Sequence, residues 1–375
     1  NIAVEGLPSW RRLEVPKKVP AAQWLDMPVE QRRLTAKVRK GRQKANRSND
    51  ADVMSFEEDM AIVARLAVAE RFYTPMNMDW RSRVYSLTHI NFQREDRVRS
   101  LFLFANGEPI GEDGLYWLKL HVANCGAFKV EVEGEKIGCD KLPFEERIKW
   151  VDDNLVLITD YVKRPLHNTG WTKADAPFLF LAACKELVSA LQSGPHYVCH
   201  LPVSWDGSCN GLQHITSAAR APEGRHVNLT DCKKPEDVYQ LVAGIVKNMV
   251  TADLGSNELF GKRDESKPER KTVMTLGMLA SVSLPFIERK LVKRNVLTFG
   301  YASKEFGMSE QHFEDTMAPL ELKWLKGEID AHPFGETDDE WRLFSRYLAK
   351  RTLAAIKSVL PAAAEAMEFM QKLAK

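Results

Sequence analysis

The chain is organised around the stretch LPVSWDGSCNGLQH, residues 201–214. An apolar run leads into one carboxylate, Asp206, and Gly207 follows directly. This order predicts a buried strand, a tight turn with an acid at its open end, and then the start of a helix. A carboxylate beside a glycine, whose backbone can approach an ion closely, suits Mg²⁺. The alternative is an ordinary turn aspartate, with Ser208 or Asn210 capping the following helix.

Length and composition indicate a globular protein with more than one subdomain. The chain has 375 residues, of which 44% are hydrophobic and 28% charged, with a net charge of +2. No run approaches the ~18 uninterrupted apolar residues of a membrane span, and the N-terminus has no apolar signal region. The 6 cysteines are scattered without a C-x-x-C pair, which predicts free thiols in a reducing, cytoplasmic location. The chain begins with Asn1 and ends within a helical pattern, so we expect a piece of a longer protein.

The first 50 residues are basic, and we expect them to be irregular in structure. Residues 31–49 carry many lysines and arginines and no acidic residue. Such a run repels itself and favours a polyanion, which each cation could bind with release of counterions. A solvated linker explains the same composition equally well.

Residues 76–87, MNMDWRSRVYSL, mix aromatic residues with two arginines. In a strand, Arg81 and Arg83 would lie on one face, because side chains two apart point the same way. Two guanidinium groups on one face suit a phosphate or a carboxylate. A structural ion pair with Asp79 or Glu95 is an equally good interpretation.

The remaining pattern is mostly helical. We expect an amphipathic helix over residues 56–72, a mainly helical region over 108–196 with glycines near 126–138, and a helix over 235–250. Near the C-terminus the apolar spacing predicts helix on both sides of Pro361, which divides or kinks it. The predicted fold class is α+β and predominantly helical.

Residues 286–306, FIERKLVKRNVLTFGYASKEF, form the second informative stretch. Arg289, Lys293, Leu297 and Tyr301 recur every four residues, so on a helix they advance about 40° per step and share one face. Two cations followed by an apolar residue and a tyrosine can bind phosphates at one end and a ring or base at the other. An exposed helix face with one packed tyrosine is the alternative.

Three blocks, in order, resemble the single-subunit, bacteriophage-type DNA-dependent RNA polymerases, which are related to the mitochondrial enzymes. They are DWRSRVY (79–85), WDGSCNGLQH (205–214) and RKLVKRNVLTFGYASKEFG (289–307). The first is similar to the block that opens the palm, the second to polymerase motif A and the third to motif B on the fingers. Weaker similarity covers most of residues 55–375.

The resemblance implies a role for each matching residue. Asp206, with the carbonyl of Gly207, would bind the metal, and the complete enzyme would hold two Mg²⁺ ions. The catalytic residues would be Asp206, Lys293 and Tyr301. The nucleotide would be bound by Arg289, Lys293, Tyr301 and Tyr239, and the nucleic acid by Arg81, Arg83 and Arg99. Two metal ions about 4 Å apart and cations on the phosphate oxygens suit in-line phosphoryl transfer.

The implied fold is a right-hand polymerase. Its expected parts are a basic thumb or N-terminal-domain remnant (1–55), palm (56–107), a palm insertion (108–196), palm with motif A (197–222) and fingers (223–375). Two features depart from the family pattern. Ala302 follows Tyr301 where the family usually has glycine, and no His-Asp pair, the family's second catalytic motif, occurs in the chain.

The resemblance implies template-directed transfer of ribonucleotides to an RNA 3′ end. The expected partners are a DNA template, nascent RNA and ribonucleoside triphosphates, for a monomer encoded by a phage and located in the bacterial cytoplasm. The expectation for the isolated chain is little or no activity. A related DNA polymerase is one alternative, although that class carries a glutamate soon after the motif A aspartate, and residues 208–211 here are SCNG. A non-catalytic nucleic-acid-binding remnant is the other.

Overall fold

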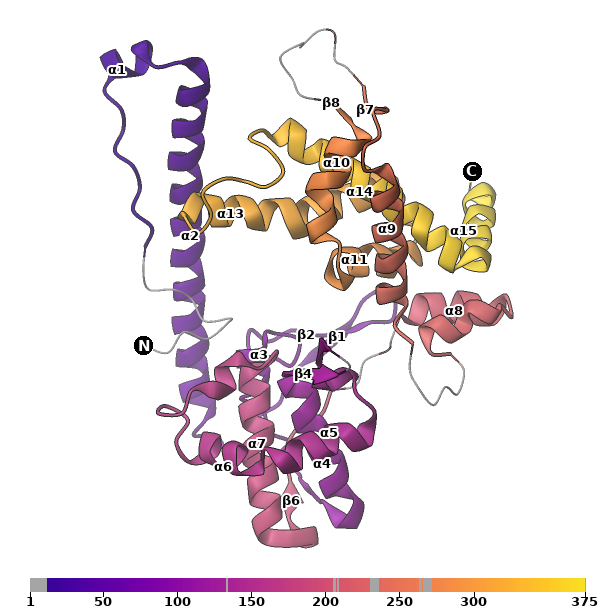
Figure 1. Ribbon diagram of the computed structural model, residues 1–375. Helices are drawn as coiled ribbons and strands as arrows, with labels where there is room; N and C mark the ends of the chain where they lie inside the picture. Colours follow the sequence, from indigo (N-terminus) through magenta and orange to yellow (C-terminus); the bar gives the residue numbers. More distant parts are fainter. Residues whose placement is uncertain are drawn as a thin grey trace. The chain divides into compact units, whose positions relative to one another are not determined.

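Two compact units share the chain in this computed structural model, which describes residues 12–132, 134–204, 207, 209–229, 236–262, 265 and 272–374. The first unit comprises Asn1–Arg12 and Asn46–Trp205, and the second Leu13–Ala45 and Asp206–Lys375. Helix α2 (Val29–Leu66) crosses the boundary between residues 45 and 46, so both units include part of it (Figure 1).

A helical cluster forms the core of the first unit. Its helices are α4 (Gly111–Gly126), α5 (Phe144–Asp153), α6 (Leu155–Lys163) and α7 (Pro177–Ser193). Helix α7 packs against α4 and α6, and the fully buried side chains between these helices include Val122, Ile158, Phe180 and Leu187. The predicted helical character of residues 108–196 is therefore confirmed.

Short antiparallel strand pairs complete the first unit. The pairs are β1 (Met76–Met78) with β2 (Val84–Ser86), β3 (Glu108–Pro109) with β6 (Val198–Cys199), and β4 (Lys129–Val132) with β5 (Glu135–Gly138). The one-turn helix α3 (Asp96–Arg99) packs against the start of α7, where the Asp96 carboxylate accepts hydrogen bonds from the backbone N–H groups of Phe178 and Leu179.

The second unit is built mainly from helices around a long central one, α14 (Asp338–Val359). Its other elements are α1 (Ala21–Asp26), α8 (Asn210–Ala218), α9 (Val238–Asp253), β7 (Leu259–Gly261), β8 (Val273–Thr275), α10 (Leu276–Ser283), α11 (Arg289–Phe299), α12 (Glu305–His312), α13 (Ala318–Lys326) and α15 (Pro361–Leu373). Trp341 and Tyr347 of α14, Val246 of α9 and Val292 of α11 are buried in one continuous core. Figure 1 shows α9, α10, α11 and α14 grouped together.

Local sequence signals set the ends of α14. The Thr337 hydroxyl accepts a hydrogen bond from the Glu340 backbone N–H, and the Glu340 carboxylate accepts one from the Thr337 backbone N–H, which is a capping box. At the other end Pro361 begins α15, because proline lacks the N–H that an uninterrupted helix would need. The predicted division at Pro361 is confirmed.

The basic N-terminal stretch is not irregular: residues 29–66 form α2, so that expectation was wrong. Some of its cations are held by the rest of the second unit. Lys37 Nζ lies 2.8 Å from Asp338 Oδ1 and 3.8 Å from the centre of the Trp341 ring, and Arg42 Nε donates to the Leu325 carbonyl at 2.6 Å. These contacts also exclude a free linker. Within the basic stretch 31–49, four cations of α2 remain exposed for a polyanion: Arg33, Lys40, Lys44 and Arg47.

The predicted buried strand before Asp206 was also wrong. Among the described residues of this stretch, only Val198–Cys199 is a strand, and it pairs with the two-residue strand β3. Val198 and Val203 are 43% and 47% exposed. The expected helix start is confirmed, since α8 begins at Asn210. Across the described ranges, no helix is both long enough and apolar enough to span a bilayer.

Candidate active site

The start of α8 has a strained backbone. Its N-cap residue, Cys209, has a φ of 52°, in the left-handed region that costs a residue with a side chain about 1–2 kcal/mol. Among the described residues no side chain caps this helix. Asn210 is its first helical residue and accepts a hydrogen bond from the Tyr301 hydroxyl at 3.3 Å instead. The capping role considered for Asn210 was therefore wrong, and Ser208 lies outside the described residues.

Asp237 organises the start of α9. Its Oδ1 atom accepts hydrogen bonds from the backbone N–H groups of Tyr239 and Gln240, at 3.0 and 3.1 Å, which is a standard N-cap. Its Oδ2 atom accepts a hydrogen bond from Nε of Arg289, the first residue of α11, at 2.5 Å. One carboxylate thus joins the N-terminal ends of two helices.

Tyr239 extends this connection to α8. The Arg289 guanidinium carbon lies 4.8 Å from the centre of the Tyr239 ring, close enough for a cation–π contact. The Tyr239 hydroxyl and the Cys209 thiol are hydrogen bonded at 2.5 Å. The four residues Asp237, Arg289, Tyr239 and Cys209 therefore form a continuous chain of contacts, here called the Arg289 network.

Burial keeps two members of the network uncharged. Removal from water raises the pKa of the Cys209 thiol, although the hydrogen bond from Tyr239 partly offsets the effect. Removal from water is also the main reason that the pKa of the Tyr239 hydroxyl is raised, and the bond to Cys209 adds to it. Because only the thiolate is strongly nucleophilic, Cys209 acts as a packed, hydrogen-bonded thiol here.

Tyr301 lies beyond the end of α11, which stops at Phe299. The expectation that all four residues spaced by four share a helix face was thus wrong for Tyr301. Its backbone N–H bonds to the Thr298 carbonyl at 2.9 Å in a turn, and its side chain is 64% exposed. The following residue, Ala302, has a φ of 65°, a conformation that glycine adopts without strain.

Lys293 follows Arg289 by one turn of α11 and is exposed. Its charge acts on the Cys209 thiol together with that of Arg289. Within the second unit the structure thus brings Arg289, Lys293 and Tyr239 to one place. Tyr301 reaches the same start of α8 through Asn210.

Asp206 and Gly207 are the predicted metal ligands. Asp206 lies outside the described residues, and Gly207 is exposed. The part of the chain that is described contains no group of three or more His, Cys, Asp or Glu side chains able to hold a metal ion. The described side chains therefore do not form a Mg²⁺ site by themselves.

Comparison with known proteins identifies the family. Residues 108–375 match the model of the family described as DNA-dependent RNA polymerase. The chain belongs to the phage-type DNA-dependent RNA polymerases. It is similar to T7 RNA polymerase of Escherichia phage T7, with 35% identity over 99% of this chain and 40% of that protein. It is also similar to the DNA-directed RNA polymerase of Enterobacteria phage T3, with 33% identity over 100% of this chain and 41% of that protein.

The family extends beyond phages. The mitochondrial DNA-directed RNA polymerase of Schizosaccharomyces pombe is 38% identical over 56% of this chain and 18% of its own length. The chain spans about 40% of the length of the T7 and T3 relatives.

The three arginines that the polymerase resemblance assigned to nucleic acid lie in the first unit. Arg81 and Arg83 are in the turn between β1 and β2, not within a strand, so the shared strand face considered for them is not formed. Arg81 donates to Asp79 Oδ2 through Nε and Nη2, at 3.1 and 2.9 Å, which confirms the structural ion pair considered for it. The Asp79 carboxylate also accepts from the backbone N–H of Arg83, the first cause of its lowered pKa. Arg99 ends α3 and is partly buried.

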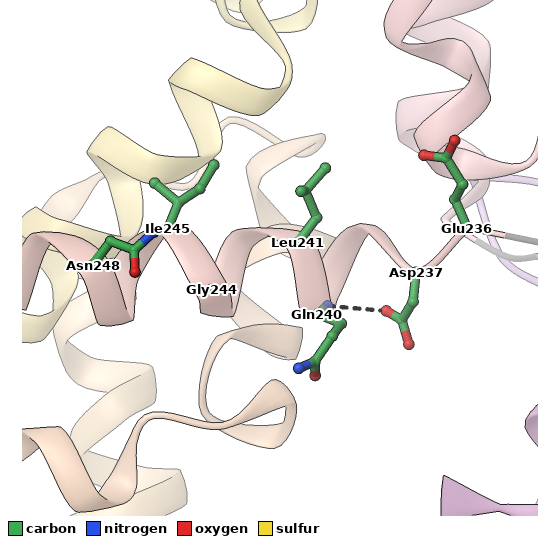
Figure 2. Close-up of a pocket in the computed structure, with 7 residues that line it drawn as sticks. All are labelled: Glu236, Asp237, Gln240, Leu241, Gly244, Ile245 and Asn248. Carbon is green, nitrogen blue, oxygen red and sulfur yellow. Dashed lines mark hydrogen bonds between the residues drawn. The ribbon is translucent and has the colours of Figure 1, made fainter. Parts of the chain in front are cut away.

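A groove of about 680 Å³ lies along the exposed side of α9 (Figure 2). The residues that line it are Glu236, Asp237, Gln240, Leu241, Gly244, Ile245 and Asn248. It shares only Asp237 with the Arg289 network. Because its lining includes two carboxylates and neither lysine nor arginine, it does not suit the triphosphate that a polymerase binds.

Sequence reasoning missed Asp237 and Cys209 as parts of the site. Asp237 carried a usable signal, because an aspartate just before an apolar run of period 3.6 marks a helix N-cap. Its bond to Arg289, 52 residues away, had no such signal. Nothing in the sequence around Cys209 indicates a left-handed backbone or a bond to Tyr239.

Proposed function

We propose that this chain is part of a DNA-directed RNA polymerase that transfers ribonucleotides to an RNA 3′ end. Arg289 and Lys293 bind the triphosphate, Tyr301 lies beside the ribose, and Tyr239 lines the nucleotide pocket. The observation that carries the proposal is the Arg289 network. It holds Arg289 at the start of α11, one turn before Lys293, in a chain of the polymerase family.

The proposal includes a metal and a fold. Asp206 and the Gly207 carbonyl are the proposed Mg²⁺ ligands, and bound Mg²⁺ supplies charge neutralisation at the transferring phosphate. The proposed parts of a right hand are a thumb remnant (1–55), palm (56–107 and 197–222), palm insertion (108–196) and fingers (223–375).

The proposed partners are a DNA template, nascent RNA and ribonucleoside triphosphates. Arg83 and Arg99 are assigned to the nucleic acid, and Arg81 to both the nucleic acid and its Asp79 pair. The protein is proposed to act as a monomer. The phage relatives support a bacterial cytoplasm as its location, although relatives from other compartments belong to the same family.

Nucleotide binding tests the proposal. Isothermal titration of the 375-residue chain with ATP in the presence of Mg²⁺ is compared for the unmodified protein, R289A and K293A. Loss of a hydrogen bond between charged groups predicts an affinity about tenfold lower or more for each variant. The matched control is K290A, which removes an exposed cation from the same helix and is expected to bind as the unmodified protein does.

Equal affinities for R289A, K293A and K290A would contradict the phosphate-binding role. A parallel titration with dATP separates the alternatives, since an RNA polymerase site prefers ATP and a DNA polymerase site does not. Absence of ATP binding together with strong, salt-dependent binding of a primed template would favour the non-catalytic nucleic-acid binder.

A further inference from the structure

The hydrogen bond between Asp237 and Arg289 uses only one edge of the guanidinium group. Asp237 Oδ2 accepts from Nε at 2.5 Å. Within the described ranges, neither terminal nitrogen of Arg289 has a hydrogen-bond partner, and the side chain is 33% exposed. Arginine binds phosphate best through two parallel N–H groups, so an edge that keeps both terminal nitrogens available suits a phosphate.

We propose that Asp237 is a positioning residue, which with the Tyr239 ring fixes the plane of the Arg289 guanidinium so that its terminal nitrogens face the triphosphate. The inference rests on the proposed function of Arg289. Asp237 itself touches no phosphate in this arrangement, because a carboxylate repels one.

Two contacts with different partners hold the guanidinium group. The bond to Asp237 holds the guanidinium at its Nε edge, and the Tyr239 ring, with its centre 4.8 Å away, lies near the guanidinium carbon. A free arginine side chain loses about 2 kcal/mol of rotamer entropy when it is immobilised. A side chain that is already held before the ligand arrives loses less of this entropy on binding.

The anchor is itself rigid. Asp237 Oδ1 is occupied by the backbone N–H groups of Tyr239 and Gln240, so the carboxylate cannot rotate without uncapping α9. Tyr239 is held at its far end by the Cys209 thiol. The position of Arg289 is thereby tied to the starts of α8 and α9.

Two substitutions separate the two jobs of Asp237. In D237N, the amide oxygen can still cap α9, because asparagine is as good an N-cap as aspartate. Its NH₂ group then faces the Nε–H of Arg289, so two donors meet and the ion pair is lost. In D237S the hydroxyl still caps α9, but no carboxylate oxygen remains to accept the hydrogen bond from Arg289 Nε.

The probe is inorganic tripolyphosphate, measured by isothermal titration of the full 375-residue chain. D237N and D237S are each expected to lower its affinity about tenfold, a value reduced for partial exposure of the pair. The deciding measurement is a double-mutant cycle with R289A. A residue that acts through Arg289 has no further effect once Arg289 is removed, so D237N/R289A should bind as R289A does.

Two results would overturn the inference. One is an affinity for tripolyphosphate that is unchanged or higher in D237N and D237S. A higher affinity would mean that Asp237 competes with the phosphate. The other is that D237N lowers the affinity of the R289A protein by the same factor as it lowers that of the unmodified protein. Asp237 would then act independently of Arg289. The thermal midpoint, measured for every variant, is expected to stay within a few degrees because the cap is retained.

Substitutions of Tyr239 test the same inference while leaving Asp237 unchanged. Y239F keeps the ring beside the guanidinium and loses only the bond to Cys209, so it should bind tripolyphosphate within about twofold of the unmodified protein. Y239L removes the ring face and should bind it more weakly, by about the size of an exposed cation–π contact, roughly two- to fivefold. Equal affinities of Y239F and Y239L for tripolyphosphate would contradict the claim that the Tyr239 ring fixes the plane of the Arg289 guanidinium.

Tripolyphosphate binding by R289A and D237N tests the role of Asp237 separately from the proposed role of Arg289. If R289A weakens tripolyphosphate binding but D237N does not, Arg289 binds phosphate without help from Asp237. If R289A itself has no effect, the phosphate-binding role of Arg289 fails first.

Discussion

At the scale of single residues, two positions in the candidate site have a left-handed backbone conformation. Cys209 has a φ of 52° before α8, and Ala302 a φ of 65° after Tyr301. The resemblance to the polymerase pattern led us to expect glycine at the second position, and glycine adopts a positive φ without strain. With alanine there, the turn carries strain that its surroundings must offset.

The substitution A302G is expected to raise the free energy of unfolding by up to about 1.5 kcal/mol. Relief of left-handed strain, about 1–2 kcal/mol, exceeds the entropy that glycine adds to the unfolded chain, about 0.4–1 kcal/mol. Urea unfolding measures the change. The control is A354G at an exposed position within α14, which should lower the stability by about 1 kcal/mol. A loss of stability in both variants would contradict the strain at Ala302.

Prediction of side-chain positions from the spacing in sequence succeeded where the residues lie on one regular helix. Arg289 and Lys293 do lie one turn apart on α11, as four-residue spacing predicts. Tyr301 obeys the same spacing in sequence, but the helix has already ended, so the rule no longer applies to it. Whether a periodic pattern continues depends on where the backbone stops being helical, and α11 ends at Phe299.

At the scale of elements, α14 shows how a short signal places a long helix. Thr337 and Glu340 cap its first turn, and Glu340 is almost fully buried at 5% exposure. The Glu340 carboxylate accepts hydrogen bonds from the backbone N–H groups of Glu336 and Thr337. Since α14 is central to the core of the second unit, loss of this cap should affect the whole unit.

The substitution T337A is expected to lower the free energy of unfolding by about 1 kcal/mol, and T337S by much less. Alanine leaves the Glu340 backbone N–H without its side-chain acceptor, while serine restores one. Thermal unfolding followed by far-ultraviolet circular dichroism compares the three proteins. Equal midpoints for T337A and T337S would show that the box does not stabilise α14.

At the scale of the whole molecule, the core of the second unit encloses a histidine. His312 is fully buried, and this burial lowers its pKa from 6.5 to about 3. Its Nε2 lies 3.3 Å from the Thr352 hydroxyl of α14. In the unfolded chain the imidazole takes up a proton below about pH 6.5, and in the folded protein it stays neutral until about pH 3.

The stability contributed by a neutral His312 is therefore complete above about pH 6.5 and is lost as the pH falls toward 3. Between these values the unfolded chain binds more protons, so the free energy of unfolding drops by up to about 1.4 kcal/mol per pH unit. The variant H312Q, which has no group that titrates there, should show a shallower fall. His332 titrates in the same direction in both proteins, since burial is the main reason that its pKa is lowered, and so cancels in the comparison. Parallel curves of thermal midpoint against pH would contradict this account.

The amino-acid sequence by itself determined the family, the predominantly helical α+β class and the placing of Arg289 and Lys293 one turn apart on a helix. These follow from local information: side-chain spacing, cap residues, proline positions and short blocks of residue order. The same local information failed for the basic stretch 31–49, because nothing nearby in sequence shows that Lys37 and Arg42 have partners near residues 325 and 338.

Only the tertiary structure decided how the candidate site is held together. Asp237 meets Arg289 across 52 residues and Tyr239 meets Cys209 across 30, and neither pairing has a sequence periodicity behind it. Such contacts arise because helices pack in three dimensions, where burial and hydrogen bonding select partners regardless of separation along the chain. The stretch at residues 201–214 contributes Cys209 to this network, and the fold joins it through Tyr239 to Arg289, the cation proposed to bind phosphate.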